Sequence, residues 1–347
     1  MIPDHHTFFS DPHISDPVQW FEGGEDPMLI GEAADFRFQK KRREGIQLVA
    51  GTFLLVLVLT VTTTGLPQFG SELSRASAVE AGEEKKPENP VPAVSPPELS
   101  AQAYSVRFAG FLAPIAYQRE WKPLAPASIT KLITAAAALE TLAPETIIEI
   151  SKNAKAVGPK MSQVRTGDHF QRDTAIRIML IESANDVAWA LAEAVEKAKT
   201  GNNPEDGLPH FLESAGAIAA HAGMVNSHFL NPTGLDMDGH MATAEDFSKL
   251  AEYILREHPE LWEITKLSID EAVSIENRLY ALENTNELLG EFPALQGGKT
   301  GLTDKAKGTL VLLYPVSPSH TAIIVILGSE NRFEDGRKLI HWLEEAF

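Results

Sequence analysis

The spacing of apolar and polar residues differs between the first third of the chain and the rest. From about residue 101 onwards, apolar residues recur at helical intervals in several segments, and two later runs are apolar almost throughout. Helices are predicted directly after Ser128 and over 173–199, 208–222, 244–257 and 333–346, and strands over 307–316 and 320–327. Two adjacent strands before a closing helix, with helices inserted earlier, indicate one α+β layered domain over residues 101–347.

An uncharged stretch at residues 45–66 is the clearest signal in the first third. It is dominated by Leu, Val and Thr, and its length suits one helical crossing of a bilayer. The basic cluster at residues 40–43 precedes it, which predicts that the amino-terminal side stays in the cytoplasm. Because a cleaved signal peptide usually has a much shorter leading region, we expect a retained signal anchor with the large domain on the far side of the membrane.

The segments on either side of this stretch have no core of their own. Residues 1–44 are rich in Asp, Glu, Pro and Gly without apolar periodicity, which predicts a disordered cytoplasmic tail. Residues 67–100 place several prolines among Glu, Lys, Ser and Ala, which is typical of an extended linker. Such a linker suits a domain that acts on something outside the membrane.

Composition excludes several kinds of function. The chain has 48 acidic and 30 basic residues, and its net charge of -18 repels polyanions, so nucleic acid is not expected as a partner. It has no cysteine, which excludes thiol catalysis, disulfide bonds and Cys-ligated metal. No His, Asp or Glu residues have the spacing of metal ligands, so no metal or other cofactor is expected.

The first candidate for chemistry is the S-x-x-K motif formed by Ser128 and Lys131. Pro126 and Ala127 precede it, so Ser128 is predicted at the start of a helix. A spacing of three puts the hydroxyl and the amine one turn apart on the same face. A serine hydroxyl becomes a good nucleophile when a neighbouring base takes its proton, and a neutral lysine amine can do so. The alternative is a helix-capping serine beside a surface lysine.

The second motif is S-x-N, formed by Ser183 and Asn185. Small polar residues interrupt two apolar helical stretches at this point, which predicts a short loop between helices. Ser183 is suited to relay a proton to the leaving group, and Asn185 to hold a substrate amide and the lysine amine. Helix capping by the same two residues is the local alternative.

The third motif, K-T-G, occurs twice. The copy at Lys199 ends a long helical pattern with a glycine, which is ordinary helix termination. The copy at Lys299, Thr300 and Gly301 lies beside strand-like sequence and follows two glycines, where another backbone can approach closely. A lysine and a threonine hydroxyl on an edge strand suit binding of a carboxylate, so the later copy is the functional candidate.

In this order the three motifs match the signature shared by penicillin-binding proteins and class A β-lactamases. Residues 101–347 resemble the D-alanyl-D-alanine carboxypeptidases, the low-molecular-mass penicillin-binding proteins of serine peptidase family S11. PASITKLITA resembles their nucleophile helix and RFEDGRKLIHWLEEAF their closing helix. HFLNPTGLDMDGHMATAEDFSKLA, at residues 228–251, is similar to their NP-x-GL…GH…TA-x-D stretch and is more specific than any of the three motifs.

The resemblance implies a β-lactamase/transpeptidase-like fold, with an antiparallel sheet flanked by helices and an inserted helical subdomain. It also implies hydrolysis of the terminal D-Ala-D-Ala bond of peptidoglycan stem peptides in a bacterial cell wall, with β-lactams as covalent inhibitors. Ser128 would attack the carbonyl between the two D-alanines, and Lys131 would act as general base. Ser183 and Asn185 would support proton transfer and substrate placement.

The resemblance further implies which residues bind the substrate. Lys299 and Thr300 would hold the terminal carboxylate, and Gly301 would keep side-chain bulk out of the cleft. The N–H groups of the nucleophile and of Leu302 would form the oxyanion hole. Arg332 stands where many relatives have an arginine on the carboxylate side. Leu302 departs from the His that many relatives carry after K-T-G, and the hairpin before the nucleophile, RFAGFLAPIAYQREW, lacks their usual turn.

Several alternatives remain open from the sequence. A D,D-endopeptidase that cuts cross-links would use the same residues as a carboxypeptidase. A β-lactamase would need an E-x-x-L-N loop, which is absent between Lys199 and Met241. A catalytically weak wall-binding or regulatory module is the non-enzyme alternative, and intact Ser128 and Lys131 favour the enzyme over it.

Overall fold

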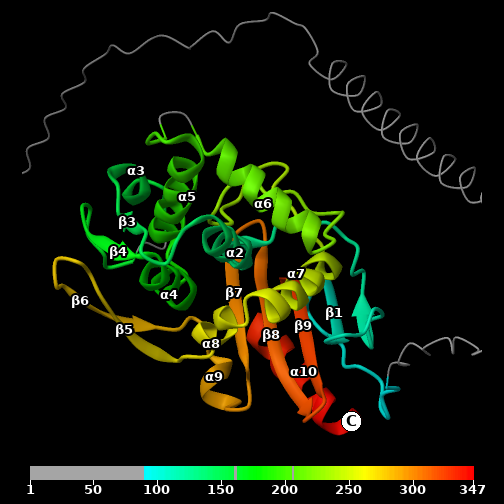
Figure 1. Ribbon diagram of the computed structural model, residues 1–347. Helices are drawn as coiled ribbons and strands as arrows, with labels where there is room; N and C mark the ends of the chain where they lie inside the picture. The colour runs from blue at the N-terminus through cyan, green and yellow to red at the C-terminus, as the bar shows by residue number, and fades with distance from the viewer. Residues whose placement is uncertain (1–89, 160–161, 205–206) are drawn as a thin grey trace, which may run out of the picture. The chain divides into compact units, whose positions relative to one another are not determined.

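The computed structural model describes residues 90–159, 162–204 and 207–347, which all belong to one unit, Glu84–Phe347 (Figure 1). The predicted tail, the membrane anchor at residues 45–66 and most of the predicted linker lie outside the described residues. None of the described helices is both long enough and apolar enough to span a bilayer.

An antiparallel sheet forms the centre of the described region. Its five strands within that region follow the order β2-β1-β9-β8-β7, so β7 is an edge strand. The strands are β1 (Ala103–Phe108), β2 (Ala116–Gln118), β7 (Gly297–Thr303), β8 (Lys307–Ser317) and β9 (His320–Ser329). Lys299 pairs with Val311, Val311 with Val325, and Val325 with Ser105, which sets the register across the sheet.

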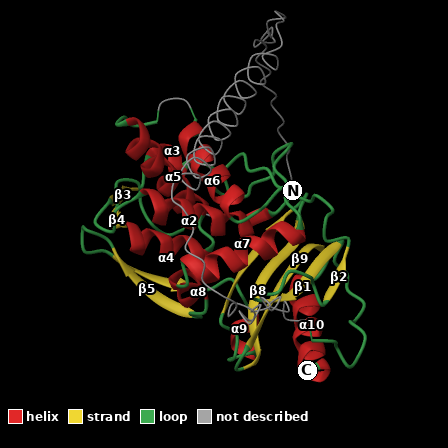
Figure 2. Ribbon diagram, turned by 45° about the vertical axis from the view of Figure 1, so that its right-hand side comes forward, coloured by secondary structure: helices red, strands yellow, loops and turns green. Residues whose placement is uncertain are grey.

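Both faces of the sheet are covered, which explains the uninterrupted apolar runs of β8 and β9. Side chains alternate between the faces of a strand, so Val311 and Leu313 enter one core while Leu310 and Leu312 enter the other. The first core lies under the helices that follow Ser128, and the second lies against α10 (Arg332–Ala346). Figure 2 shows the sheet between these two layers. A strand buried on both faces needs apolar residues at every position.

Most helices between β2 and β7 build the layer that carries most of the candidate residues, whereas α9 (Leu288–Glu291) packs in the second core beside α10. A 3-10 turn, η2 (Ala127–Thr130), leads directly into α2 (Lys131–Thr141). The other helices of this stretch are α3 (Lys152–Lys155), α4 (Arg172–Glu182), α5 (Asn185–Thr200), α6 (Pro209–His221), α7 (Ala244–Glu257) and α8 (Glu260–Thr265). The pattern over 173–199 is therefore two helices, separated at Ser183 and Ala184.

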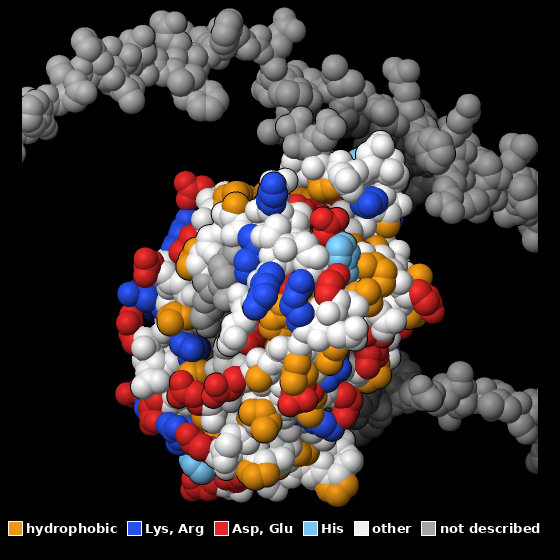
Figure 3. Space-filling model, turned by 90° about the vertical axis from the view of Figure 1, so that its left-hand side faces the viewer, with side chains coloured by type: hydrophobic (Ala, Val, Ile, Leu, Met, Phe, Trp, Pro, Cys, Tyr) orange, Lys and Arg blue, Asp and Glu red, His pale blue; other side chains and the backbone are white. Residues whose placement is uncertain are grey.

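Two small two-stranded sheets project from the helical layer, and only the second is a hairpin of neighbouring strands. One pairs β3 (Ile147–Glu149) with β4 (His169–Gln171), and the other pairs β5 (Ile269–Val273) with β6 (Leu279–Glu283). The inward side chains of the β5–β6 hairpin, such as Ala272, are buried, whereas its outward face exposes apolar residues. Figure 3 views the molecule from this side and shows exposed apolar side chains among acidic ones.

The first described residues pack along the last helix. Ala93 N donates to Ala346 O over 3.1 Å, and Trp342 Nε1 donates to Val94 O over 3.0 Å. Ser100 bonds through its N–H and its hydroxyl to the carboxylate of Asp335, over 2.9 and 2.8 Å. Residues 93–100, placed in the linker on sequence grounds, thus contact α10.

The predicted architecture is confirmed at the level of the α+β transpeptidase-like fold, with an antiparallel sheet flanked by helices. The predicted helices at 208–222, 244–257 and 333–346 correspond to α6, α7 and α10 within one residue at each end, and the two late strands correspond to β8 and β9. The predicted transmembrane helix lies outside the described residues and stays a prediction.

Candidate active site

Ser128 and Lys131 are in direct contact where η2 leads into α2. The turn η2 presents Ser128, and Lys131 is the first residue of α2, so the two side chains lie one turn apart. Lys131 Nζ lies 2.9 Å from Ser128 Oγ, and the Lys131 side chain is fully buried while Ser128 is partly exposed. Ala127 adopts a positive φ of 50°, which turns the chain sharply just before Ser128.

Lys131 also donates to two groups that can only accept. Its Nζ donates to Asn185 Oδ1 over 2.6 Å and to Thr233 O over 2.7 Å. The side-chain amide of Asn185 cannot be flipped, because its Nδ2 donates to Pro159 O. A neutral amine has two N–H groups and one lone pair. In a neutral amine whose N–H groups are directed at Asn185 and Thr233, the lone pair faces Ser128 Oγ, which is the arrangement that a general base requires.

Ser183 and Lys299 form the second contact of the cleft. Ser183 follows α4 in the left-handed conformation, with φ 60° and ψ 33°, and this turn separates α4 from α5. Lys299 Nζ donates to Ser183 Oγ over 2.8 Å and to Thr300 O over 3.0 Å. Both side chains are buried, so the S-x-N turn is linked directly to the edge strand β7. A non-glycine residue in this conformation is a form of strain that is common at functional sites.

The edge strand β7 lies directly against η2, the turn that carries Ser128. A Cβ at Gly301 would lie 2.8 Å from Ser128 N and 2.9 Å from Ala127 Cβ, so only glycine permits this approach. Thr300 Oγ1 lies 2.6 Å from Thr285 Oγ1. The sequence prediction of an edge strand that carries K-T-G is confirmed by the strand order.

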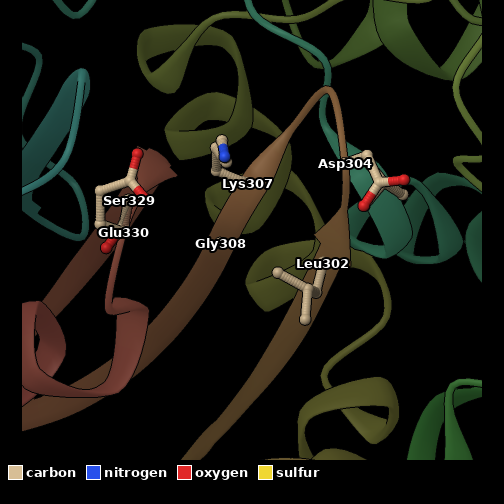
Figure 4. Close-up of a pocket in the computed structure, with 7 residues that line it drawn as sticks. Leu302, Asp304, Lys307, Gly308, Ser329 and Glu330 are labelled. Carbon is tan, nitrogen blue, oxygen red and sulfur yellow. The ribbon is translucent and has the colours of Figure 1, made fainter.

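Leu302 and Arg332 lie at the far end of this strand. The Leu302 side chain is 57% exposed and lines a hollow of about 420 Å³ beyond the β7–β8 turn, together with Asp304, Lys307 and Glu330 (Figure 4). Arg332 packs beside Gly308, the residue paired with Leu302, and its guanidinium lies 4.3 Å from the centre of the Phe333 ring. Burial lowers the pKa of Arg332 from its ordinary value. Among the described residues, Lys299 is hydrogen-bonded to Ser183, whereas no such bond joins Arg332 to the candidate residues.

The other K-T-G copy lies away from these contacts. Lys199 and Thr200 are exposed in the last turn of α5, and Gly201 ends the helix with a φ of 77°. The prediction that this copy terminates a helix is therefore confirmed.

The main residues that sequence reasoning missed lie in the loop 230–240. It supplies the Thr233 carbonyl to Lys131, and Gly234 packs so tightly that a Cβ there would lie 1.8 Å from Ala127 O. The NP-x-GL…GH stretch pointed to this loop without showing its role. Every residue has a backbone carbonyl, so the amino-acid sequence does not mark the one that bonds to Lys131.

A carboxylate beside the cleft is also perturbed. Burial, together with the neighbouring charge of Asp186, raises the pKa of Glu182 to about 6. Asp186 itself is fully buried and accepts from Lys155 Nζ over 2.6 Å and from Ser162 Oγ over 2.9 Å. These bonds fasten the chain near Pro159 to the start of α5, where Asn185 lies. Among the described residues, no group of three or more acidic, His or Cys side chains is arranged to hold a metal ion.

The fold and the grouping of Ser128, Lys131, Ser183, Asn185 and Lys299 define a protein of the penicillin-binding, transpeptidase-like class. The family described as D-alanyl-D-alanine carboxypeptidase, peptidase S11, matches residues 93–331. The chain belongs to this family.

Relatives and solved structures agree with this assignment. The chain is 28% identical over 229 residues to the D-alanyl-D-alanine carboxypeptidase DacF of Bacillus subtilis, covering 65% of this chain and 56% of that protein. It is 31% identical over 228 residues to a D-alanyl-D-alanine endopeptidase of Pseudomonas aeruginosa, covering 63% of this chain and 69% of the relative. The chain thus spans little more than half the length of the Bacillus relative.

The solved structures share the fold. The Streptomyces K15 DD-transpeptidase superposes with a TM-score of 0.65 at 22% identity, covering 72% of this chain and 99% of that one. A D-alanyl-D-alanine carboxypeptidase from Mycobacterium tuberculosis gives a TM-score of 0.63 at 23% identity, covering 73% and 94%.

Proposed function

We propose that the chain is a serine-type, penicillin-sensitive D,D-carboxypeptidase that removes the terminal D-Ala from peptidoglycan stem peptides. The observation that carries this proposal is the contact of Lys131 Nζ with Ser128 Oγ, in which two obligate acceptors take the other hydrogens of the amine. This arrangement supplies a buried base directed at a partly exposed hydroxyl. Family membership supports the substrate class.

The reaction follows from these positions. Ser128 Oγ attacks the carbonyl carbon between the two D-alanines while its proton passes to Lys131 Nζ. The N–H groups of Ser128 and Leu302 receive the developing oxyanion, which the close packing of Gly301 on Ser128 N supports. The C–N bond then breaks, the proton passes to the leaving D-Ala amine with Ser183 and Asn185 nearby, and water later releases the acyl group.

Lys299 and Thr300 are proposed to bind the terminal carboxylate. Lys299 is buried and linked to Ser183, which orients a positive charge along the edge strand. Arg332, at the start of α10 and beside Gly308, the residue paired with Leu302, is proposed to add a second positive charge near this end of β7.

Covalent labelling tests the proposal. The full-length chain is treated with a fluorescent penicillin, and wild type is compared with Ser128→Ala. Labelling that is lost in the variant establishes Ser128 as the nucleophile. A well-folded wild type that takes no label contradicts the enzyme proposal and favours a wall-binding module.

A D,D-endopeptidase is the second candidate, because relatives of that name include the Pseudomonas protein with 31% identity. Both activities break a bond that follows a D-alanine carbonyl and would use the same residues. Release of D-Ala from a pentapeptide, measured beside cleavage of a cross-linked muropeptide dimer, separates them. The ratio of the two rates decides which activity the chain has.

We further propose that residues 45–66 anchor the protein as a single span in the bacterial cytoplasmic membrane, with residues 1–44 inside and the peptidase domain outside. The apolar stretch and the basic cluster at residues 40–43 support this topology. Protease treatment of intact spheroplasts should digest the domain and leave the amino-terminal tail protected. The opposite pattern would overturn it.

A further inference from the structure

His240 is a buried histidine whose two ring nitrogens join separate parts of the cleft wall. It is 3% exposed and ends the loop 230–240, next to the isolated bridge between His228 and Met241. Its Nε2 lies 3.1 Å from Thr130 Oγ1, and its Nδ1 lies 3.1 Å from Leu230 N. The first contact reaches the residue between the nucleophile and the base, and the second reaches the start of the loop.

These partners determine the tautomer. A backbone N–H can only donate, so Nδ1 accepts from Leu230 and carries no proton. The proton of a neutral ring is then on Nε2, which donates to the Thr130 hydroxyl. Burial, with the neighbouring charge of His228, lowers the pKa of His240 to about 4, so the neutral ring persists at physiological pH.

The loop tied by His240 is fixed at several further points. Asn231 Oδ1 accepts from Thr233 N over 3.1 Å and from Gly234 N over 2.8 Å. Thr134 Oγ1 donates to Pro232 O over 2.7 Å. The carbonyl of Thr233, which follows directly, is therefore held from both sides. That carbonyl accepts one hydrogen of Lys131 Nζ and so decides where the amine lone pair points.

We propose that His240 is a positioning residue for the base of this site. It joins the turn that carries Ser128 to the loop that supplies the Thr233 carbonyl, and in this way sets the direction of the Lys131 lone pair toward Ser128 Oγ. His240 touches neither substrate nor the reacting atoms, so its effect falls on the rate of acylation and leaves substrate binding intact. The inference rests on the proposed function.

The test measures acylation by a fluorescent penicillin at several concentrations, which separates the acylation rate constant from the dissociation constant of the preceding complex. We expect His240→Ala to lower the rate constant about 10–100-fold, because small misplacements of catalytic groups cost rates of that order. The dissociation constant should stay within about threefold of wild type. His240→Gln offers an amide oxygen for Leu230 N and an amide N–H for Thr130, so it should restore most of the rate.

Controls separate this role from general loss of structure. His221→Ala, at the exposed end of α6, should leave both constants unchanged. Thr130→Val removes the other partner of the 3.1 Å contact, so it should reproduce the rate loss and add little to His240→Ala. This second variant keeps the test decisive where His240→Ala fails to fold.

Two results would overturn the inference. One is an unchanged rate constant in His240→Ala or in Thr130→Val. The other is an equal loss of the acylation rate constant in His240→Ala and His240→Gln, which would indicate that the shape of the ring matters and its hydrogen bonds do not. Absence of labelling in the wild type instead contradicts the proposed function, so the two failures are distinguishable.

Discussion

Lys299 Nζ donates a 2.8 Å hydrogen bond to Ser183 Oγ, although the two residues are 116 positions apart in the chain. The bond joins the edge of the main sheet to the left-handed turn between two helices. The position of Lys299 therefore depends on the helical layer and the sheet being packed together.

Lys299→Ala should abolish most penicillin acylation, with a loss of about 100-fold or more, because a buried charged hydrogen-bond donor for the ligand carboxylate and for Ser183 is removed. The matched control is Lys199→Ala, in the other K-T-G copy, where the side chain is exposed at the end of α5. That variant should label like wild type. Equal labelling of the two variants would show that the motif at 299 was assigned wrongly.

Gly234→Ala should destabilise the fold by several kcal/mol, about 2–4, since the new Cβ meets a backbone carbonyl and the residue has a positive φ. The φ is 83° and the Cβ would lie 1.8 Å from Ala127 O. Gly216→Ala is the control, because this exposed glycine lies within α6 with open space around it. It should stabilise by about 0.5–1 kcal/mol. Urea unfolding of both variants measures the difference.

Because His240 is buried as a neutral ring, the free energy of unfolding should fall as the pH is lowered. Its pKa is lowered from 6.5 to about 4 in the folded protein. The unfolded chain therefore binds more protons between these values, and stability is lost as the pH falls from 6.5 through 4. The expected loss by pH 4.5 is about 2–3 kcal/mol from this residue. His240→Gln should lack this component in urea unfolding at pH 7.5 and 4.5. The same pH slope in variant and wild type would contradict the buried neutral ring.

Glu182 should give stability the opposite pH dependence from His240. Its pKa is raised from 4.5 to about 6, mainly by burial. The folded protein therefore holds the proton more tightly, and this contribution is present below pH 4.5 and lost as the pH rises through 6. Glu182→Gln should then stabilise by about 1 kcal/mol at pH 7.5, after allowance for partial exposure, and by little at pH 4. The stability of Glu182→Gln is compared with that of wild type at each pH. The prediction is wrong if the gain of the variant over wild type is no larger at pH 7.5 than at pH 4.

The ion pair between Arg107 and Glu245 joins β1 to α7 with both side chains buried. Arg107→Met should cost about 3–5 kcal/mol, because it leaves a buried carboxylate without its main partner. The double variant Arg107→Met/Glu245→Met should recover most of that loss, since the unpaired charge is removed. Thermal unfolding of the single and double variants provides the comparison, and equal stability of the two would contradict the prediction.

Several parts of this structure were predictable because they depend on residue type and spacing. The apolar runs of β8 and β9, the amphipathic pattern of α7 and the glycine that ends α5 are local signals. The contact of Ser128 with Lys131 follows from one helical turn. The position of K-T-G on an edge strand follows from its neighbours in the sequence.

Other parts were not predictable from local pattern. The Thr233 carbonyl is a backbone group, and its contact with Lys131 spans 102 positions of the chain. The need for glycine at 234 comes from the approach of Ala127, more than a hundred residues earlier. The packing of residues 93–100 on α10 was missed because Val94 and Leu99 are isolated apolar residues among prolines.

That packing determines how the chain enters the domain. Residues 93–94 run along α10, on the opposite face of the sheet from η2 and Ser128. The first described residues therefore lie on the side of the sheet away from Ser128. The proposed substrate, peptidoglycan, is a bulky, cross-linked polymer that must be approached as a surface, and residues 93–94 do not obstruct its approach to Ser128.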